Sequence, residues 1–343
     1  MNELKKPVFI IAELSANHGG KLEVALDTVV AAKEAGADAI KIQTYTADTI
    51  TINADTEDFY ISGGTLWDKR KLYDLYTEAS LPWEWHQAIF EKAREVGLVC
   101  FSTPFDHTAV DFLETLRNPI YKIASFEITD IPLISYAASK HKPMIISTGI
   151  ATYEDIKLAV DTCKAAGNND ITLLKCTSSY PAPLEEANMT LMQQFKVDFK
   201  VKVGLSDHTL GNTVPVVATV LGAEVIEKHF ILDHALGGPD AAFSMDVAEF
   251  TAMVRAVRAA ESAIGEVNYD LTEKQKKGLV FSRSLYIVKN VKKGELLTSD
   301  NVRSIRPGYG LHPKYFEELV NKSIFIEDFS AGTRLSFDLI EKK

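Results

Sequence analysis

Short apolar runs rich in β-branched residues alternate with amphipathic helical stretches along most of the chain. The predicted strands are Val8–Leu14, Ala39–Thr44, Val99–Thr103, Ile120–Ser125, Met144–Thr148, Ile171–Thr177, Lys202–His208 and Val225–Ile231. Strands that alternate with helices form a parallel sheet, because each right-handed crossover helix brings the chain back to the end of the sheet where the previous strand began. Eight such units within about 250 residues are typical of a closed (β/α)8 TIM barrel, which is the α/β fold we expect.

A doubly wound open sheet is the alternative arrangement of the same units. The amphipathic stretches are Leu22–Ala35, Trp83–Val96, Ala109–Leu116, Glu154–Ala166, Val214–Leu221 and Glu249–Ala263. The sequence contains neither a G-x-G-x-x-G nor a G-x-x-x-x-G-K-[ST] phosphate loop, the signatures that commonly accompany open nucleotide-binding sheets. The pattern therefore favours the barrel.

The pattern changes after Gly265. A polar stretch, Glu266–Lys277, is followed by short strand-like pieces at Ser284–Val288 and Leu335–Leu339. We therefore predict a barrel domain at 1–265, a linker at 266–281 and a small domain at 282–343. So small a domain has little core of its own and is expected to depend on a partner surface.

Composition narrows the class of protein. The 343 residues carry a net charge of −10 and are 46% apolar, which suits a soluble globular protein and disfavours nucleic acid as a partner. No apolar run is long enough to span a membrane. The three cysteines, Cys100, Cys163 and Cys176, have neither disulfide-framework nor metal-site spacing. We expect a cytoplasmic enzyme without a membrane partner.

Polar residues end nearly every predicted strand. Charged groups on a covered strand must be paired or liganded, and the upper ends of barrel strands carry active sites. We expect Lys41, Lys122 and Lys175 to converge with hydroxyls, where ammonium groups would bind a phosphate and a carboxylate. The participating hydroxyls are Thr103, Ser125, Ser147, Ser178 and Ser206. The alternative is that these lysines form structural ion pairs with Glu13, Glu127, Asp207 or Glu227.

His208 and His229 end the seventh and eighth predicted strands. Their imidazoles could meet at one metal ion, and the surrounding oxygen ligands would favour Mn²⁺ or Mg²⁺ over structural zinc. The alternative is a pair of satisfied core histidines. We expect His86 at the surface and Cys176 as an inert buried thiol.

The long segment Asp48–Leu72 is interpreted as a substrate lid.

These motifs together resemble the sialic acid synthase family over nearly the whole chain. They are Ala12–Gly20, Lys41–Tyr45, Tyr121–Glu127, Ile146–Gly149, Lys175–Pro181, Gly204–His208, Glu227–Phe230, Gly238–Asp240 and Arg306–Gly310. Within the family, Gly64–Tyr73 and Trp83–His86 are most similar to the pseudaminic acid synthase branch. The resemblance implies a TIM barrel followed by a small antifreeze-like (SAF) domain.

The resemblance also implies an activity and a set of site residues. Members condense phosphoenolpyruvate with an amino-sugar aldehyde, with C–O cleavage and release of phosphate. By resemblance, metal ligands fall on His208 and His229, and the sugar contacts fall on Glu13, Tyr180, Asp240 and Arg306. The phosphoenolpyruvate contacts fall on Lys41, Thr103, Lys122, Ser125, Ser147, Ser178 and Ser206. Glu13 and Glu127 are the candidate catalytic carboxylates, and a domain-swapped homodimer is implied.

Three other activities stay open at this point. A Schiff-base aldolase would use Lys175 or Lys122 as its nucleophile. An N-acetylneuraminate or legionaminate synthase would differ only in the sugar that it accepts. A non-catalytic sugar-binding module is a rival of another class, although Glu13, Glu127 and both histidines are retained.

Overall fold

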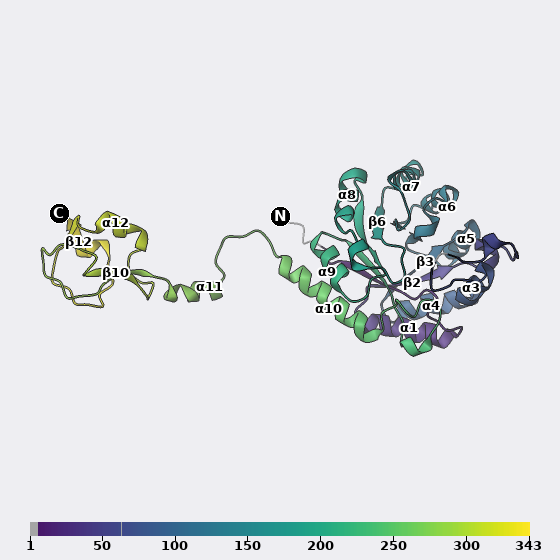
Figure 1. Ribbon diagram of the computed structural model, residues 1–343, viewed down its shortest axis with the longest axis horizontal. Helices are drawn as coiled ribbons and strands as arrows, with labels where there is room; N and C mark the ends of the chain where they lie inside the picture. The colour runs from purple at the N-terminus through teal and green to yellow at the C-terminus, as the bar shows by residue number, and fades with distance from the viewer. Residues whose placement is uncertain (1–5, 63) are drawn as a thin grey trace. The chain divides into compact units, whose positions relative to one another are not determined.

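The computed structural model describes residues 6–62 and 64–343 of the chain. It divides into two compact units, Met1–Gly265 and Glu266–Lys343. Figure 1 shows the first as a barrel of strands surrounded by helices, and the second as a small unit of short strands and turns. Each unit is described by itself.

The first unit is a closed barrel in which all the strands run parallel, in the order β1 to β8. The strands are β1 (Phe9–Glu13), β2 (Ala39–Thr44), β3 (Val99–Pro104), β4 (Tyr121–Ile123), β5 (Met144–Ser147), β6 (Ile171–Cys176), β7 (Lys202–Asp207) and β8 (Val225–His229). Each predicted strand is present, with ends shifted by a few residues. The barrel prediction is therefore confirmed, and the doubly wound alternative is wrong.

Helices connect the strands. They are α1 (Leu22–Glu34), α2 (Ala47–Ile50), α3 (Leu72–Ala79), α4 (His86–Glu95), α5 (His107–Thr115), α6 (Ile131–Ala138), α7 (Tyr153–Ala165), α8 (Thr190–Phe199), α9 (Thr213–Val220) and α10 (Val247–Ile264). Local signals define several ends: Thr152 and Asp155 form a capping box at the start of α7. Gly36 follows α1 with φ 94°, a left-handed conformation that suits glycine.

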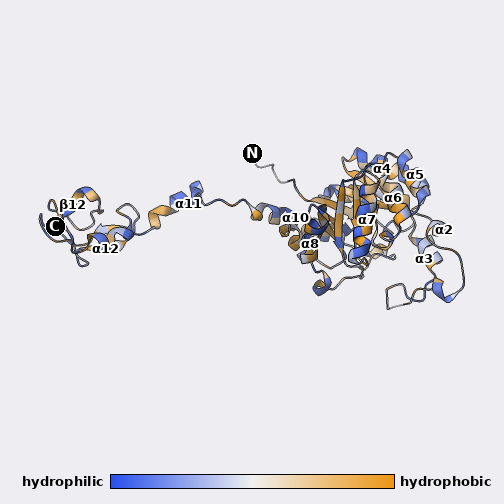
Figure 2. Ribbon diagram, turned by 90° about the horizontal axis from the view of Figure 1, so that it is seen from above, coloured by the Kyte–Doolittle hydropathy of each residue, from blue (hydrophilic) through white to orange (hydrophobic). Residues whose placement is uncertain are grey.

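Two apolar cores lie on opposite sides of the strand wall. The larger core packs the helices against the outside of the barrel and includes Ile10, Ile40 and Phe250. A smaller core fills the interior with Ile11, Ala39, Phe101, Ile145, Leu174 and Val225. Apolar colouring marks the strands in Figure 2. The apolar filling ends toward the carboxyl ends of the strands, which leaves that end of the interior for polar residues.

His86 does not lie at the surface as expected. Its side chain is fully buried, and its Nε2 lies 2.8 Å from Thr44 Oγ1 while its Nδ1 lies 3.2 Å from the carbonyl of Pro82. Thr44 in turn contacts Ser102 Oγ at 2.6 Å. The imidazole of His86 can be buried at the start of α4 because both of its ring nitrogens have hydrogen-bonding partners.

The second unit contains two antiparallel strand pairs, β9 (Ser284–Ile287) with β10 (Val302–Ile305), and β11 (Ser323–Phe325) with β12 (Ile340–Lys342). Two short helices accompany them, α11 (Glu273–Gly278) and α12 (Phe316–Leu319). A compact core is built from Leu285, Ile287, Val291, Leu297, Val302, Phe325 and Leu335. The strand expected at Leu335–Leu339 is wrong, because Phe337–Leu339 forms a 3-10 turn ahead of β12.

The polar stretch Glu266–Lys277 is also more structured than expected. It runs into α11, where Thr272 and Gln275 form a capping box. Throughout residues 6–62 and 64–343, every helix is too short or too polar to cross a bilayer.

Candidate active site

Alternation along the strands separates the polar residues into two sets. Side chains of a strand point alternately to its two faces. A residue two positions after an interior apolar residue on the same strand therefore also faces inward. Ile11 and Ala39 belong to that layer, so Glu13 and Lys41 face the barrel interior. The same step leads from Val225 to Glu227. The inward polar residues therefore gather at one end of the barrel.

Lys41 lies at the centre of the first cluster. Its Nζ is 2.7 Å from Glu13 Oε2 and 3.6 Å from Glu227 Oε1, and it donates to Thr103 Oγ1 at 3.1 Å. Glu13 Oε1 accepts a hydrogen bond from Gln43 at 2.8 Å. Lys41 and Glu13 are almost completely buried, so their charges are stabilised by each other and by these hydrogen bonds.

Lys122 lies on the other side of Glu227. Its Nζ is 3.7 Å from Glu227 Oε1 and donates to Ser147 Oγ at 2.7 Å. Glu227 therefore lies between two buried ammonium groups. Burial lowers the pKa of Lys122. Burial opposes ionisation of Glu227 as well, but Lys122 and Lys41 hold the pKa of that carboxyl below its usual range.

A small cradle of hydroxyls lies beside these lysines. The backbone N–H of Gly149 donates to Ser125 Oγ at 3.0 Å. A Cβ on Gly149 would come within 2.0 Å of Ser178 Oγ and 2.8 Å of Ser125 Oγ. Ser178 Oγ is buried and has no hydrogen-bond partner within the described residues. Glycine is required at 149 to leave room between the two hydroxyls, and the free Oγ of Ser178 can serve a ligand.

The two strand-end histidines are neighbours, with ring centroids 5.3 Å apart. His208 Nδ1 lies 3.0 Å from the carbonyl oxygen of Thr177, which favours a proton on Nδ1 and therefore a lone pair on Nε2. His229 Nδ1 is buried without a hydrogen bond in the described part of the chain and lies 3.7 Å from Asp240 Oδ2. Two converging imidazoles with free nitrogens and a carboxylate nearby fit a divalent metal ion.

Three other residues of the predicted site are Tyr180, Ser206 and Glu127. The ring of Tyr180 is 4.4 Å from that of His208, centroid to centroid. Ser206 is buried on β7. Glu127 follows β4 in a short 3-10 turn, and its Oε2 is buried without a partner in the described structure. Burial raises the pKa of Glu127 to about 7.

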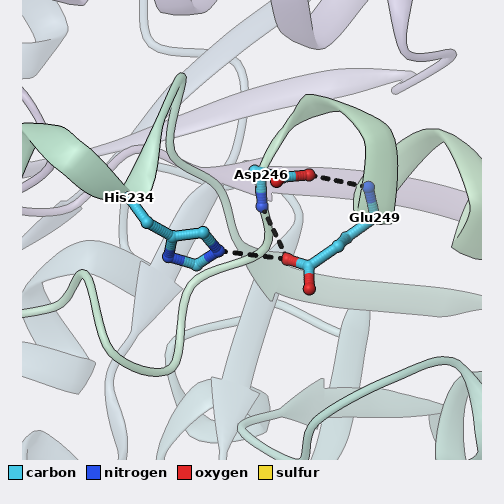
Figure 3. A group of neighbouring side chains, drawn as sticks. All are labelled: His234, Asp246 and Glu249. Atoms are coloured by element: carbon cyan, nitrogen blue, oxygen red, sulfur yellow. Dashed lines mark hydrogen bonds and ion pairs between the residues drawn. The ribbon is translucent and has the colours of Figure 1, made fainter.

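A second group of metal-type side chains lies elsewhere on the barrel. His234, Asp246 and Glu249 bring their ligand atoms within 4.8 Å of one another. Figure 3 shows that Asp246 and Glu249 each accept a hydrogen bond from the other's backbone N–H, and that His234 approaches Glu249. This is the capping box of α10. Helix capping accounts for the cluster, and it carries no metal assignment.

The lysines follow the sequence-based prediction only in part. Lys175 does not join the other lysines: its Nζ donates to the carbonyl of Cys176 at 2.7 Å and to Thr177 Oγ1 at 3.0 Å. Lys41 and Lys122 form ion pairs of the kind given as the alternative, Lys41 with Glu13 and both lysines with Glu227. The inward position of Glu227 on β8 accounts for its place between the two lysines. Arg306 belongs to the second unit, where it is exposed and directly follows β10.

Comparison with known proteins follows the same division of the chain. The NeuB family model matches residues 28–269, and the SAF domain model matches residues 282–341. The pseudaminic acid synthase of Campylobacter jejuni subsp. jejuni serotype O:2 is 54% identical, with 92% of each chain covered. The pseudaminic acid synthase of Helicobacter pylori is 48% identical over 98% of this chain and 99% of its own.

A solved structure agrees with both the fold and these relatives. The N-acetylneuraminic acid synthetase of Leptospira borgpetersenii superposes with a TM-score of 0.71 at 30% identity, covering 80% of this chain and 91% of its own. The resemblance inferred from the motifs is confirmed. The chain, a TIM barrel followed by a SAF domain, belongs to the NeuB family of sialic acid synthases.

Proposed function

We propose that this protein is a pseudaminic acid synthase, a transferase of the phosphoenolpyruvate-dependent nonulosonic acid synthases. It condenses phosphoenolpyruvate with 2,4-diacetamido-2,4,6-trideoxy-L-altrose and releases pseudaminic acid and phosphate. The observation that carries the proposal is the paired burial of Lys41 and Lys122 beside hydroxyls and two histidines. The choice of sugar is supported by 48–54% identity to pseudaminic acid synthases over more than 90% of the chain.

The charges of the site suit phosphoenolpyruvate. In the free site Glu13 and Glu227 neutralise Lys41 and Lys122. The phosphate and carboxylate of the substrate add further negative charge, so another cation is needed in the same cavity. His208 and His229 would hold that cation, because their free nitrogens fit a divalent metal. When bound there, Mn²⁺ or Mg²⁺ supplies Lewis-acid polarisation of the open-chain aldehyde.

Side chains of the barrel perform the remaining tasks. Lys122 with Ser147, and Lys41 with Thr103, bind the anionic groups of phosphoenolpyruvate. Ser125, Ser178 and Ser206 add hydroxyl donors that carry no charge. Tyr180 and Asp240 position the sugar. Held in this way, the C3 carbon of phosphoenolpyruvate attacks the aldehyde carbon, and positive charge develops at C2.

The two candidate carboxylates take different roles in this proposal. Glu13 is engaged by Lys41 and Gln43, so its proposed role is to stabilise the positive charge that develops at C2. Glu127 has a free carboxylate oxygen and a pKa of about 7, which suits a general base. It takes a proton from the water that adds at C2. The tetrahedral centre then breaks its C2–O bond and expels phosphate.

Arg306 is proposed to act from the SAF domain of a second subunit in a domain-swapped homodimer. Support comes from family membership. In the connecting segment, Val267 is 95% exposed and Tyr269 96% exposed, so both side chains are available to pack against a second subunit. Mixed dimers of Glu127→Gln and Arg306→Ala test this. Recovered activity after verified subunit exchange supports action in trans, and activity that stays at the parental level contradicts it.

One assay tests the proposed reaction. Release of inorganic phosphate from phosphoenolpyruvate is measured with the trideoxy sugar, with N-acetylmannosamine and with the legionaminate precursor. We expect the fastest turnover with the trideoxy-L-altrose, loss of turnover in EDTA, and recovery with Mn²⁺ or Mg²⁺. Faster turnover of either other sugar refutes the sugar assignment. A borohydride-trapped adduct on Lys122 together with EDTA resistance would indicate a Schiff-base aldolase instead.

A further inference from the structure

Three aromatic side chains from separate loops meet above the histidine pair. Trp67 comes from the segment between β2 and α3, Tyr180 from the segment after β6, and Phe243 from the segment after β8. The ring centroids of Trp67 lie 5.6 Å from Tyr180 and 6.4 Å from Phe243, and Tyr180 lies 4.9 Å from Phe243. These three side chains form what we call the aromatic wall.

The aromatic wall contacts both proposed metal ligands. Tyr180 is 4.4 Å from His208, and Phe243 is 4.9 Å from His229, centroid to centroid. Among the ring contacts within residues 6–62 and 64–343, Trp67 pairs with Tyr180 and Phe243 and with neither histidine, so it lies farther from the charged floor of the site. We consider a sugar with its aldehyde carbon at the histidines and its chain extending past Tyr180. The carbons at the far end of such a sugar lie against Trp67.

Trp67 offers this region an apolar surface without a free polar group. Its Nε1–H already donates to the carbonyl oxygen of Pro239 at 3.1 Å. The side chain of Phe243 has no polar atom and is 2% exposed, so it backs the indole ring from the buried side. A hydroxyl placed against the indole ring of Trp67 would lose its water without gaining a hydrogen bond, whereas a methyl group would gain from burial.

We propose that Trp67 is a specificity-determining residue that selects sugars with a methyl group at C6 over sugars with a hydroxymethyl group. The inference rests on the proposed synthase function and adds the structural feature that reads the far end of the sugar. The same hydrogen bond to Pro239 ties the lid segment to the residue before Asp240, so the wall is positioned next to a proposed sugar contact.

The test compares two sugars that differ by one oxygen atom. Phosphate release is measured with 2,4-diacetamido-2,4,6-trideoxy-L-altrose and with its 6-hydroxy counterpart. We expect Trp67→Ala to lower the ratio of kcat/KM for the 6-deoxy over the 6-hydroxy sugar by about tenfold or more. Trp67→Phe should retain most of that ratio, and the KM for phosphoenolpyruvate should stay within about twofold in both variants.

Trp83 provides a matched control. Its Nε1 also donates to a backbone carbonyl, that of Tyr45 at 3.2 Å, and its ring stacks on Phe112 at 4.7 Å. Trp83→Ala removes the same type of side chain without touching the aromatic wall, so the ratio between the two sugars should not change. An equal fall in the ratio for Trp83→Ala overturns the inference, because it would reflect general loosening of the barrel mouth.

Binding gives a second readout that does not need turnover. The chain has three tryptophans, so the double variant Trp83→Phe/Trp85→Phe reports on Trp67 alone. The 6-deoxy sugar should shift the emission of Trp67 to shorter wavelength at lower concentration than the 6-hydroxy sugar. Phosphoenolpyruvate alone should leave the emission unchanged. Equal response to both sugars overturns the inference even if Trp67→Ala fails to fold.

The two proposals fail in distinguishable ways. No phosphate release by the unaltered protein with any sugar refutes the synthase function, and the fluorescence titration still decides the role of Trp67. Release that favours the 6-deoxy sugar equally in the unaltered protein and in Trp67→Ala overturns only the inference. Release that favours the 6-hydroxy sugar in the unaltered protein overturns the inference while a synthase activity stands.

Discussion

Lys228 and Asp207 form a buried ion pair directly behind the two histidines. Lys228 Nζ lies 2.5 Å from Asp207 Oδ2, with the side chains 0% and 2% exposed. Asp207 also accepts hydrogen bonds from the backbone N–H and the hydroxyl of Thr209, at 3.0 and 3.1 Å. The pair joins the ends of β7 and β8, one residue before His208 and His229.

Lys228→Met would leave the Asp207 carboxylate buried without a counter-charge. Removing one partner of a buried pair costs about 3–5 kcal/mol, and the two bonds from Thr209 place the expected cost near the lower end, about 3 kcal/mol. At about 2–4 °C per kcal/mol for a domain of this size, Tm should fall by about 6–12 °C. Adding Asp207→Asn should recover part of this loss, because the unpaired charge disappears.

Thermal unfolding followed by tryptophan fluorescence measures this change in the barrel alone, because Trp67, Trp83 and Trp85 all belong to the first unit. Lys202→Met is the matched control: Lys202 pairs with Asp170 at 2.7 Å, but both side chains are about half exposed, so its effect should stay below about 1 kcal/mol. A Tm loss in Lys228→Met no larger than in Lys202→Met refutes the argument from burial.

Three further predictions concern the polar cluster. Lys122→Ala should raise the KM for phosphoenolpyruvate by about tenfold or more and change the sugar KM much less. Lys175→Ala removes an ammonium that donates to the Cys176 carbonyl and to Thr177, so it should leave the KM for phosphoenolpyruvate nearly unchanged. Because Glu127 must be ionised to act as a base and its pKa is about 7, kcat/KM should fall about tenfold per pH unit below pH 7, and Glu127→Gln should lose this acid limb along with most turnover. Gly149→Ala should abolish phosphoenolpyruvate binding in a titration while Tm changes little, because its Cβ would occupy the space between Ser125 and Ser178.

The barrel could be predicted because its signals are local and repeated. The strand Ala39–Thr44 is a short buried run with Asp38 before it. In Leu22–Glu34 the apolar residues recur at the spacing of a helix. The C-terminal unit lacks such repetition. Leu335 is buried in its core as an apolar residue of a strand would be, yet the chain turns at Phe337. Nothing in that short run distinguishes a strand from a turn held by its neighbours.

His86 shows a different limit of sequence reasoning. A histidine near the start of an amphipathic helix is usually solvated, and its burial here depends on Thr44 of β2 and the carbonyl of Pro82. Thr44 is 42 residues away, so the partner that makes burial possible is set by tertiary packing. The aromatic wall has the same character, because Trp67, Tyr180 and Phe243 become neighbours only when three loops meet.

The roles of the lysines, by contrast, follow from strand parity, which the sequence already contains. Lys41 is two residues after Ala39 of the interior core, so it faces inward. Lys175 follows Leu174 of that core by one residue and therefore faces outward, where it bonds to Thr177. Lys228 is three residues after Val225 and also faces outward, toward Asp207. Counting from the apolar layer thus separates substrate-facing from structural lysines, because a shift of one residue along a strand exchanges its two faces.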